Sequence, residues 1–120
     1  MRIVAVVTSV LLMASALLGS EDGALKGVVT DSSGAVISNV LVHVIRWGVD
    51  HNRATVIAEQ RDVRTNARGE YSIELPPGLY DICFSSAAFS PFAKKVELKA
   101  DKVVVLSPRM KYDHLAKSTD

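Results

Sequence analysis

The chain reads TNARGEYSIELPPGLYDI from Thr65 to Ile82, and this stretch sets the architecture of the molecule. Asn66 and Gly69 predict a tight turn, because asparagine tolerates the left-handed backbone region and glycine enters it without steric cost. Apolar and polar residues then alternate from Tyr71 to Leu75, which is the period of a half-buried strand. Pro76-Pro77-Gly78 cannot continue a ladder and predicts a second turn. The alternation then resumes, so the sequence predicts an antiparallel hairpin whose apolar faces point the same way.

Turn residues recur roughly every ten residues along the rest of the chain, and no segment has a helical period. We therefore predict an all-β sandwich of seven short strands. A loop is expected from Trp47 to Arg53, and the mixed pattern of the strand after it predicts a bulge or break near Glu59–Asp62. The predicted core consists of the inward apolar residues of these strands: Leu25, Val29, Val40, Val42, Val44, Tyr71, Ile73, Tyr80, Ile82, Phe84, Val96, Leu98, Val104 and Leu106.

Three motifs of the chain resemble the carboxypeptidase regulatory-like domain, a module of the transthyretin-like (prealbumin-like) class with a carbohydrate-binding-like fold. The first is the Thr-Asn-x-x-Gly-x-Tyr run of residues 65–71, and the second is the Pro-Gly-x-Tyr run of residues 77–80. The third is the Gly-x-Val-x-Asp-x-x-Gly run of residues 27–34. The resemblance extends from Leu25 to Lys111 and implies a single seven-stranded Greek-key β-sandwich.

The resemblance implies little about function, since modules of this kind accompany many different proteins. The chain departs from the family at Ala88, where many members carry a glycine before the aromatic residue that is Phe89 here. The functional motifs of two related enzyme families are missing from this chain. The chain has neither the His-x-x-Glu zinc element of the metallocarboxypeptidases nor the Tyr-Arg-Gly-Ser ending of the hydroxyisourate hydrolases. We therefore predict a non-catalytic accessory module.

An apolar leader precedes the domain. Its residues from Ile3 to Leu18 are almost wholly apolar, and the small pair Gly19-Ser20 follows them. These features predict a secretory signal peptide over residues 1–20 and a secreted or periplasmic protein. An uncleaved anchor is the alternative, but the apolar run is shorter than the ~20 residues that a span needs, so no membrane span is expected in the mature chain. We assign residues 25–111 to the sandwich domain and residues 112–120 to a polar, frayed tail.

The charge balance argues against a nucleic-acid partner, because the chain has 14 basic and 13 acidic residues. The basic residues also do not cluster with aromatic side chains. Cys83 is the only cysteine, so an intrachain disulfide is impossible and the core alone must hold the domain. Strand alternation places Cys83 on the outer face of its sheet. In an oxidising compartment such a thiol can pair between chains. We predict a monomer with a minor Cys83-linked dimer.

Residues able to carry chemistry are sparse. His43, His51 and His114 are the only histidines, and no second ligand accompanies them at a useful spacing, whereas zinc requires three or four protein ligands. His51, beside Asp50, is most simply a solvated loop residue. A Cys-His nucleophile would need His43 on the strand next to Cys83, an arrangement that the sequence leaves open. We predict no catalytic residue, no metal and no cofactor.

The functional surface is predicted on the outward side of the second strand and in the loop after it. Two of the three outward residues of that strand are apolar, which is unusual for a face that meets water. We expect the partner to be a protein or a polysaccharide of the cell envelope, and we favour a protein. The alternative is a carbohydrate-binding module in which Trp47 stacks on a sugar ring. The predicted partner surface consists of Leu41, His43, Ile45, Trp47, His51 and Arg53.

Overall fold

A computed structural model describes residues 21–113, which form nine strands and no helix. The predicted signal peptide and residues 114–120 lie outside the described part. Two of the nine strands are only two residues long, which accounts for the difference from the seven predicted. The strands are β1 (Gly23–Val28), β2 (Thr30–Asp31), β3 (Leu41–Val49), β4 (Thr55–Arg64), β5 (Glu70–Leu75), β6 (Gly78–Ser85), β7 (Phe92–Leu98), β8 (Val103–Val105) and β9 (Arg109–Met110).

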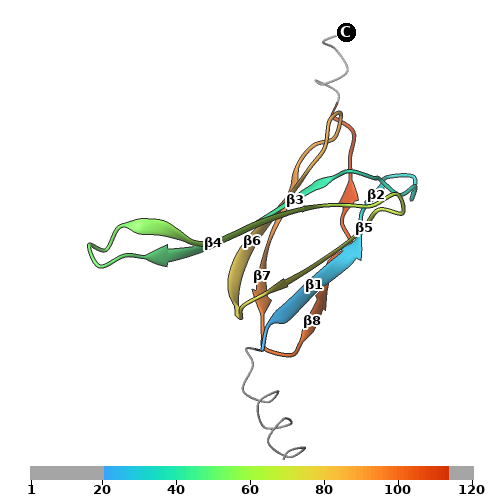
Figure 1. Cartoon of the computed structure of the whole chain (residues 1–120). Coiled ribbons are helices and arrows are strands. Elements are labelled where there is room, and N and C mark those ends of the chain that lie inside the picture. Colours follow the sequence, from blue (N-terminus) through green and yellow to red (C-terminus); the bar gives the residue numbers. More distant parts are fainter. Residues whose placement is uncertain (1–20, 114–120) are drawn as a thin grey trace, which may run out of the picture.

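The strands form a sandwich of two main sheets. One has the order β5-β1-β8, and the other has the order β4-β3-β6-β7; β2 and β9 make a small third sheet. In the first sheet β1 runs antiparallel to β5 and parallel to β8. Figure 1 shows these two sheets facing each other. The predicted all-β sandwich is confirmed, and residues 21–113 contain no helix that is long and apolar enough to cross a membrane.

The core lies between the two main sheets and is close to the predicted one. Every predicted core residue is buried except Val104 and Leu106, which are partly buried and pack against the cluster. Val104 lies in the short edge strand β8, and Leu106 directly follows it. Leu75 and Met110, which were not among the predicted core residues, are fully enclosed as well. Strand alternation therefore predicts burial well, and it fails mainly where a strand has a neighbour on one side only.

The predicted hairpin around Pro76-Pro77-Gly78 is wrong, although the alternation on both sides of it is right. β5 belongs to the three-stranded sheet and β6 belongs to the four-stranded sheet, so the corner crosses from one sheet to the other. The Tyr80 hydroxyl donates a hydrogen bond of 2.6 Å to the Pro76 carbonyl and closes this corner. The two apolar faces meet across the core instead of lying side by side. Alternation is compatible with either arrangement, and only the pairing partners distinguish them.

The motif that begins at Thr65 holds two parts of the chain together. The buried Thr65 hydroxyl donates to the Ile37 carbonyl and accepts from the Val40 amide, at 2.9 Å each. Six residues further on, the Tyr71 hydroxyl donates to the Leu106 carbonyl at 2.5 Å. Burial raises the pKa of the Tyr71 phenol, so the hydroxyl stays protonated as a donor. Both ends of the motif therefore satisfy backbone groups of distant segments.

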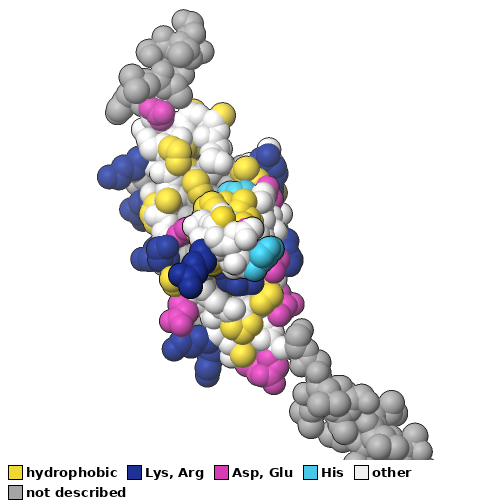
Figure 2. All heavy atoms as spheres, turned by 90° about the vertical axis from the view of Figure 1, so that its left-hand side faces the viewer, with side chains coloured by type: hydrophobic (Ala, Val, Ile, Leu, Met, Phe, Trp, Pro, Cys, Tyr) yellow, Lys and Arg dark blue, Asp and Glu magenta, His cyan; other side chains and the backbone are white. Residues whose placement is uncertain are grey.

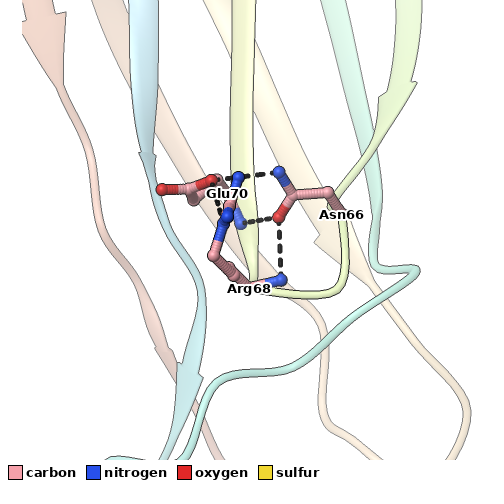
Figure 3. A network of polar contacts seen from close by, with 3 residues as sticks. All are labelled: Asn66, Arg68 and Glu70. Carbon is pink, nitrogen blue, oxygen red and sulfur yellow. Dashed lines mark hydrogen bonds and ion pairs between the residues drawn. The ribbon is translucent and has the colours of Figure 1, made fainter.

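Between these two ends the chain makes the predicted tight turn (Figure 3). The Asn66 Oδ1 atom accepts from the amides of Arg68 and Glu70, both at 2.9 Å. The Glu70 Oε1 atom accepts from Asn66 Nδ2 at 3.0 Å and from Arg68 Nε at 3.1 Å. These bonds, first the one from Asn66 and then the one from Arg68, hold the pKa of Glu70 below its usual range. Gly69 has a φ of 71°, as the turn requires.

The loop predicted after the second strand is shorter than expected. β3 continues to Val49, so the predicted loop from Trp47 to Arg53 is wrong for its first three residues. The chain turns only between Asp50 and Ala54, where the Asp50 amide donates a hydrogen bond of 3.0 Å to the Ala54 carbonyl. The register shift between β3 and β4 falls at Ala58 of β4, which has no counterpart in β3. This is one residue before Glu59–Asp62, the range in which a bulge or break was predicted.

As a consequence, β3 and β4 extend well past the sandwich. β3 pairs with β6 only from Leu41 to Ile45, whereas its pairing with β4 continues to Val49. Residues 46–58 therefore form a two-stranded ribbon, and Figure 1 shows it projecting from the body of the molecule. We call residues 46–58 the ribbon.

The predicted frayed tail is wrong for its first two residues. The Tyr112 ring stacks on Phe89 with a centroid distance of 4.6 Å, and the two residues form a backbone bridge. The Asp113 amide donates to the Ala88 carbonyl at 2.9 Å. Packing against Phe89 therefore fixes Tyr112, although the sequence of the tail lacks periodicity. His114 lies outside the described residues.

Candidate binding surface on the four-stranded sheet

The outer face of β3 carries the first four predicted surface residues. Val42 and Val44 point inward and are fully buried. Leu41, His43 and Ile45 alternate with them and are half-buried on the opposite face. Trp47 continues the same face into the ribbon and leaves 49% of its surface exposed.

His43 occupies the middle of a polar row that crosses three strands. In the strand register it lies opposite Asp62 of β4 on one side and opposite Cys83 of β6 on the other. Its Nδ1 atom donates a hydrogen bond to the Asp62 Oδ1 atom. The arrangement that the sequence left open is therefore present: the histidine, an acid and the thiol lie side by side on one face.

In the described residues this row lacks the hydrogen bond between thiol and imidazole that a cysteine nucleophile needs. The Nδ1 atom of His43 bonds Asp62 of β4, and among these residues no hydrogen bond joins the Cys83 thiol to the imidazole. Between residues 21 and 113 no group of three His, Cys, Asp or Glu side chains is close enough to share a metal ion. A cysteine nucleophile needs a base within hydrogen-bonding reach. The contact that the structure gives His43 is its hydrogen bond to Asp62.

A second polar group anchors the ribbon to the sheet. The Trp47 indole Nε1–H donates to the Asp81 Oδ2 atom at 2.9 Å. The Lys95 ammonium lies 2.9 Å from the other oxygen of the same carboxylate. Lys95 first, and Trp47 second, lower the pKa of Asp81. Asp81 and Lys95 were not in the predicted surface, because only the pairing of β3 with β6 and of β6 with β7 brings them to Trp47.

The last two predicted residues lie elsewhere, at the tip of the ribbon. His51 and Arg53 are exposed in the turn between β3 and β4. The Asp50 carboxylate shapes this turn by accepting from the amides of Asn52 and Ala54, at 2.8 and 2.9 Å. Arg53 adopts a φ of 65°. The predicted surface is thus divided between the sheet face and the end of an arm.

The ribbon itself exposes apolar side chains that sequence reasoning missed. Besides Trp47, Val49 is 69% exposed, Ile57 is 49% exposed and Val56 is 38% exposed. Figure 2 looks along the ribbon onto its tip and shows hydrophobic side chains in the open beside histidine and basic side chains. Trp47 and Ile57 are cross-strand partners on the same face. Their exposure follows from the length of the ribbon. The sequence did not predict this length, because Gly48 indicates a turn.

A shallow hollow of about 510 Å³ lies on the other sheet, away from the predicted surface. Polar residues among its lining are Lys26, Asn66, Glu70, Ser72 and Ser107. Glu70 is already bonded to Asn66 and Arg68, and the Ser107 hydroxyl accepts from the Val28 amide at 3.0 Å. The polar groups of the hollow therefore largely serve the turn and the strand beside it.

These features define a β-sandwich module whose distinctive surface is a projecting apolar arm. A profile of the carboxypeptidase regulatory-like domain matches residues 24–111. The chain belongs to that family, and the resemblance seen in its three motifs is confirmed. No curated protein matches the sequence significantly.

Solved structures with a similar fold come from proteins of several kinds. The Bacillus anthracis TIE protein is 21% identical, with a TM-score of 0.58 over 77% of this chain and 17% of its own. The minor pilin of Streptococcus agalactiae is 15% identical, with a TM-score of 0.57 over 78% and 46%. Catechol 1,2-dioxygenase from Pseudomonas arvilla is 10% identical, with a TM-score of 0.60 over 80% and 54%. This chain spans about half or less of each protein, and these likenesses show the fold alone.

Proposed function

We propose that the chain is an exported, non-catalytic accessory module that binds a protein of the cell envelope through its ribbon. One observation carries the proposal: a two-stranded arm outside the sandwich exposes Trp47, Val49 and Ile57. Burying apolar surface favours folding, so a projecting arm with such side chains in the open is better suited to a partner than to water.

The rest of the molecule supports this choice, because its motif residues serve the fold. Thr65 and Tyr71 bond distant backbone carbonyls, and Asn66 holds the turn between them. The ribbon exposes its apolar side chains away from the sandwich, whereas the exposed Val103 and Val105 lie in β8, on the body of the molecule. Similarity to a pilin domain agrees with an extracellular module, and the apolar leader agrees with export.

The proposal is tested by removing apolar surface from the ribbon without touching its anchor. The variant Val49→Ser/Ile57→Ser leaves Trp47 and Asp81 intact. Its matched control is Val103→Ser/Val105→Ser, which removes two valines that are 57% and 66% exposed on the other sheet. We expect the ribbon variant to lose at least ~10-fold in retention of envelope proteins on immobilised module, while the control retains them. Equal retention by both variants would contradict the proposal.

A second candidate function is carbohydrate binding, which one observation favours. The indole N–H of Trp47 is held by Asp81, so the ring has a fixed orientation and a half-exposed surface. A preorganised aromatic ring is suited to stacking on a sugar. Titration of the purified protein with cell-envelope polysaccharide distinguishes the two functions, because Trp47 is the only tryptophan. A protein-binding arm predicts unchanged Trp47 fluorescence, and a saturable shift would favour the sugar.

A further inference from the structure

One edge of the ribbon continues the line along which β6 pairs with β3. β6 pairs with β3 only from Leu41 to Ile45, whereas β3 itself continues to Val49. Beyond Ile45, β3 has β4 on one side and, within residues 21–113, no strand on the other. Figure 1 shows that the ribbon leaves the body of the molecule here, whereas β6 stays within the sheet. The place beside β3 that β6 occupies in the sheet is therefore vacant along the ribbon.

The hydrogen-bonding phase of β3 directs backbone groups toward this vacant place. Just outside the two ends of β3, the Val40 carbonyl and the Asp50 amide each form a hydrogen bond of 3.0 Å with a residue that flanks β4. The even-numbered residues of β3 therefore bond toward β4. Because the bonding direction alternates along an antiparallel strand, the odd-numbered residues bond away from it. The N–H and C=O groups of Trp47 and Val49 thus point to the open edge.

This edge lacks the features by which proteins keep a free strand from pairing, which are charged side chains, proline and bulges. Its residues Trp47, Gly48 and Val49 are uncharged, and the two with side chains expose apolar surface. The opposite edge of the ribbon is interrupted by the bulge at Ala58 and runs on into the charged Glu59. At the far edge of the same sheet, β7 carries charged side chains. The segment of β3 in the ribbon is therefore the part of this sheet best suited to accept a further strand.

We propose that the protein partner of the ribbon supplies an extended segment, which adds to β3 as a third strand and bonds the backbones of Trp47 and Val49. The inference rests on the proposed function and states how the partner is held. A two-stranded ribbon is marginally stable in water, and a third strand supports it. In strand addition the main-chain hydrogen bonds provide affinity, and the alternate side chains provide specificity.

The side chains along the edge define the segment that fits. The two residues of the added strand that lie opposite Trp47 and Val49 share a face with these side chains and are two positions apart. Both should be apolar, because they cover exposed apolar surface. The residue between them lies opposite Gly48, which has no side chain to select it. The expected partner segment is therefore an extended strand with apolar residues at positions i and i+2.

The first test removes one backbone donor and keeps its side chain. Random decapeptides displayed on phage are selected on the purified protein, and the enriched peptides are the probe. At Val49 the α-hydroxy analogue of valine replaces the N–H by an ester oxygen. The matched control is the same change at Ile57, which lies opposite Trp47, so its N–H points to the other edge of the ribbon.

We expect the enriched peptides to share apolar residues two positions apart. They should bind the Val49 ester about fivefold more weakly than the parent protein, and the Ile57 ester as well as the parent. Equal binding to both esters, or a larger loss at Ile57, would overturn strand addition at β3.

Hydrogen exchange of the same complexes separates failure of this inference from failure of the proposed function. In the free protein the amides of Trp47 and Val49 should exchange faster than that of Gly48, and bound peptide should slow them at least ~10-fold. A peptide that leaves both amides fast but is lost in Val49→Ser/Ile57→Ser would overturn strand addition and retain the apolar ribbon as the binding surface. Peptides that bind this variant as well as the parent would contradict both.

Discussion

The indole N–H of Trp47 donates a 2.9 Å hydrogen bond to the carboxylate of Asp81, and this bond ties the projecting ribbon to the body of the sheet. Within residues 21–113, the two strands of the ribbon pair only with each other beyond Ile45. The bond therefore lies where the arm leaves the sandwich. It fixes the direction of the arm and the exposed side of the indole ring.

Removing this anchor should change the environment of Trp47. We expect Asp81→Ala to shift Trp47 fluorescence to longer wavelength, because the indole N–H then bonds water and the ribbon gains freedom. Far-ultraviolet circular dichroism should stay unchanged, since the sheet hydrogen bonds remain. The matched control is Glu97→Ala, which removes a carboxylate from the neighbouring strand β7 without touching Trp47. An unchanged emission maximum in Asp81→Ala would show that the anchor does not hold in solution.

Lowering the pH should break the hydrogen bond between Trp47 and Asp81 within a defined pH range. Lys95 and Trp47 hold the pKa of Asp81 below its ordinary value of 3.8. A lowered pKa in the folded state means that the contribution to stability is complete above the unfolded value and is lost as the pH falls through the folded one. We therefore expect Trp47 emission to be constant down to about pH 4 and to change below it. Asp81→Asn should abolish this step, and a step near neutral pH would assign it to another group.

Gly69 should tolerate substitution much less well than Gly34. Its φ is 71°, and an added Cβ would lie 2.8 Å from the Val29 carbonyl oxygen. Gly34 has a φ of 90° with nothing within 4 Å of an added Cβ, so it isolates the cost of the backbone alone. We expect Gly69→Ala to lower the free energy of unfolding by more than ~2 kcal/mol and Gly34→Ala by ~1 kcal/mol. Chemical denaturation measures both, and equal losses would refute the close contact.

Ala88 should be a site where glycine stabilises the protein. Its φ is 70°, in the region that residues with a Cβ enter at a cost of about 1–2 kcal/mol. Glycine removes this strain but gains entropy in the unfolded chain, so the net gain in Ala88→Gly should be about 0.5 kcal/mol. Thermal unfolding tests this, with Ala87→Gly as the control at a neighbouring position without a positive φ. A lower midpoint for Ala88→Gly would argue against the left-handed conformation.

Cys83 should react without global unfolding. Ile82 and Phe84 are buried, which confirms that Cys83 faces outward, where it is half-buried beside His43 and Ala93. We expect a thiol reagent to label the native protein more slowly than a free peptide thiol but well before denaturation. The minor Cys83-linked dimer stays a prediction. Non-reducing electrophoresis tests it, because the dimer band of the unchanged protein should be absent from the Cys83→Ser variant. Labelling confined to unfolded protein would contradict the outward placement.

Much of the fold could be predicted because burial follows the period of the sequence. Tyr71, Ile73 and Leu75 alternate with polar residues, and all three are buried. The family motif could be placed for the same local reason, since Asn66 and Gly69 act within a single turn. Local patterns therefore determine which side of a strand faces inward.

Pairing partners could not be predicted in the same way. The alternation on either side of Pro76-Pro77-Gly78 fits a hairpin as well as a crossing between sheets, and the structure has the crossing. Gly48 resembles a turn residue but lies within β3, where an added Cβ would be 3.0 Å from the Ala58 side chain. The length of the ribbon, and with it the exposure of Val49, depends on contacts that no local pattern contains.

The central claim is that the ribbon is the surface at which this module meets a protein partner. Site-specific photocrosslinking tests it most directly, with a photoreactive amino acid replacing Val49 at the ribbon or Val103 on the opposite sheet, expressed in the producing cell. Mass spectrometry identifies each adduct and separates a second copy of the chain from a different protein. We predict adducts with an envelope protein from position 49 and none from position 103. Adducts with such a protein from position 103 alone would contradict the account.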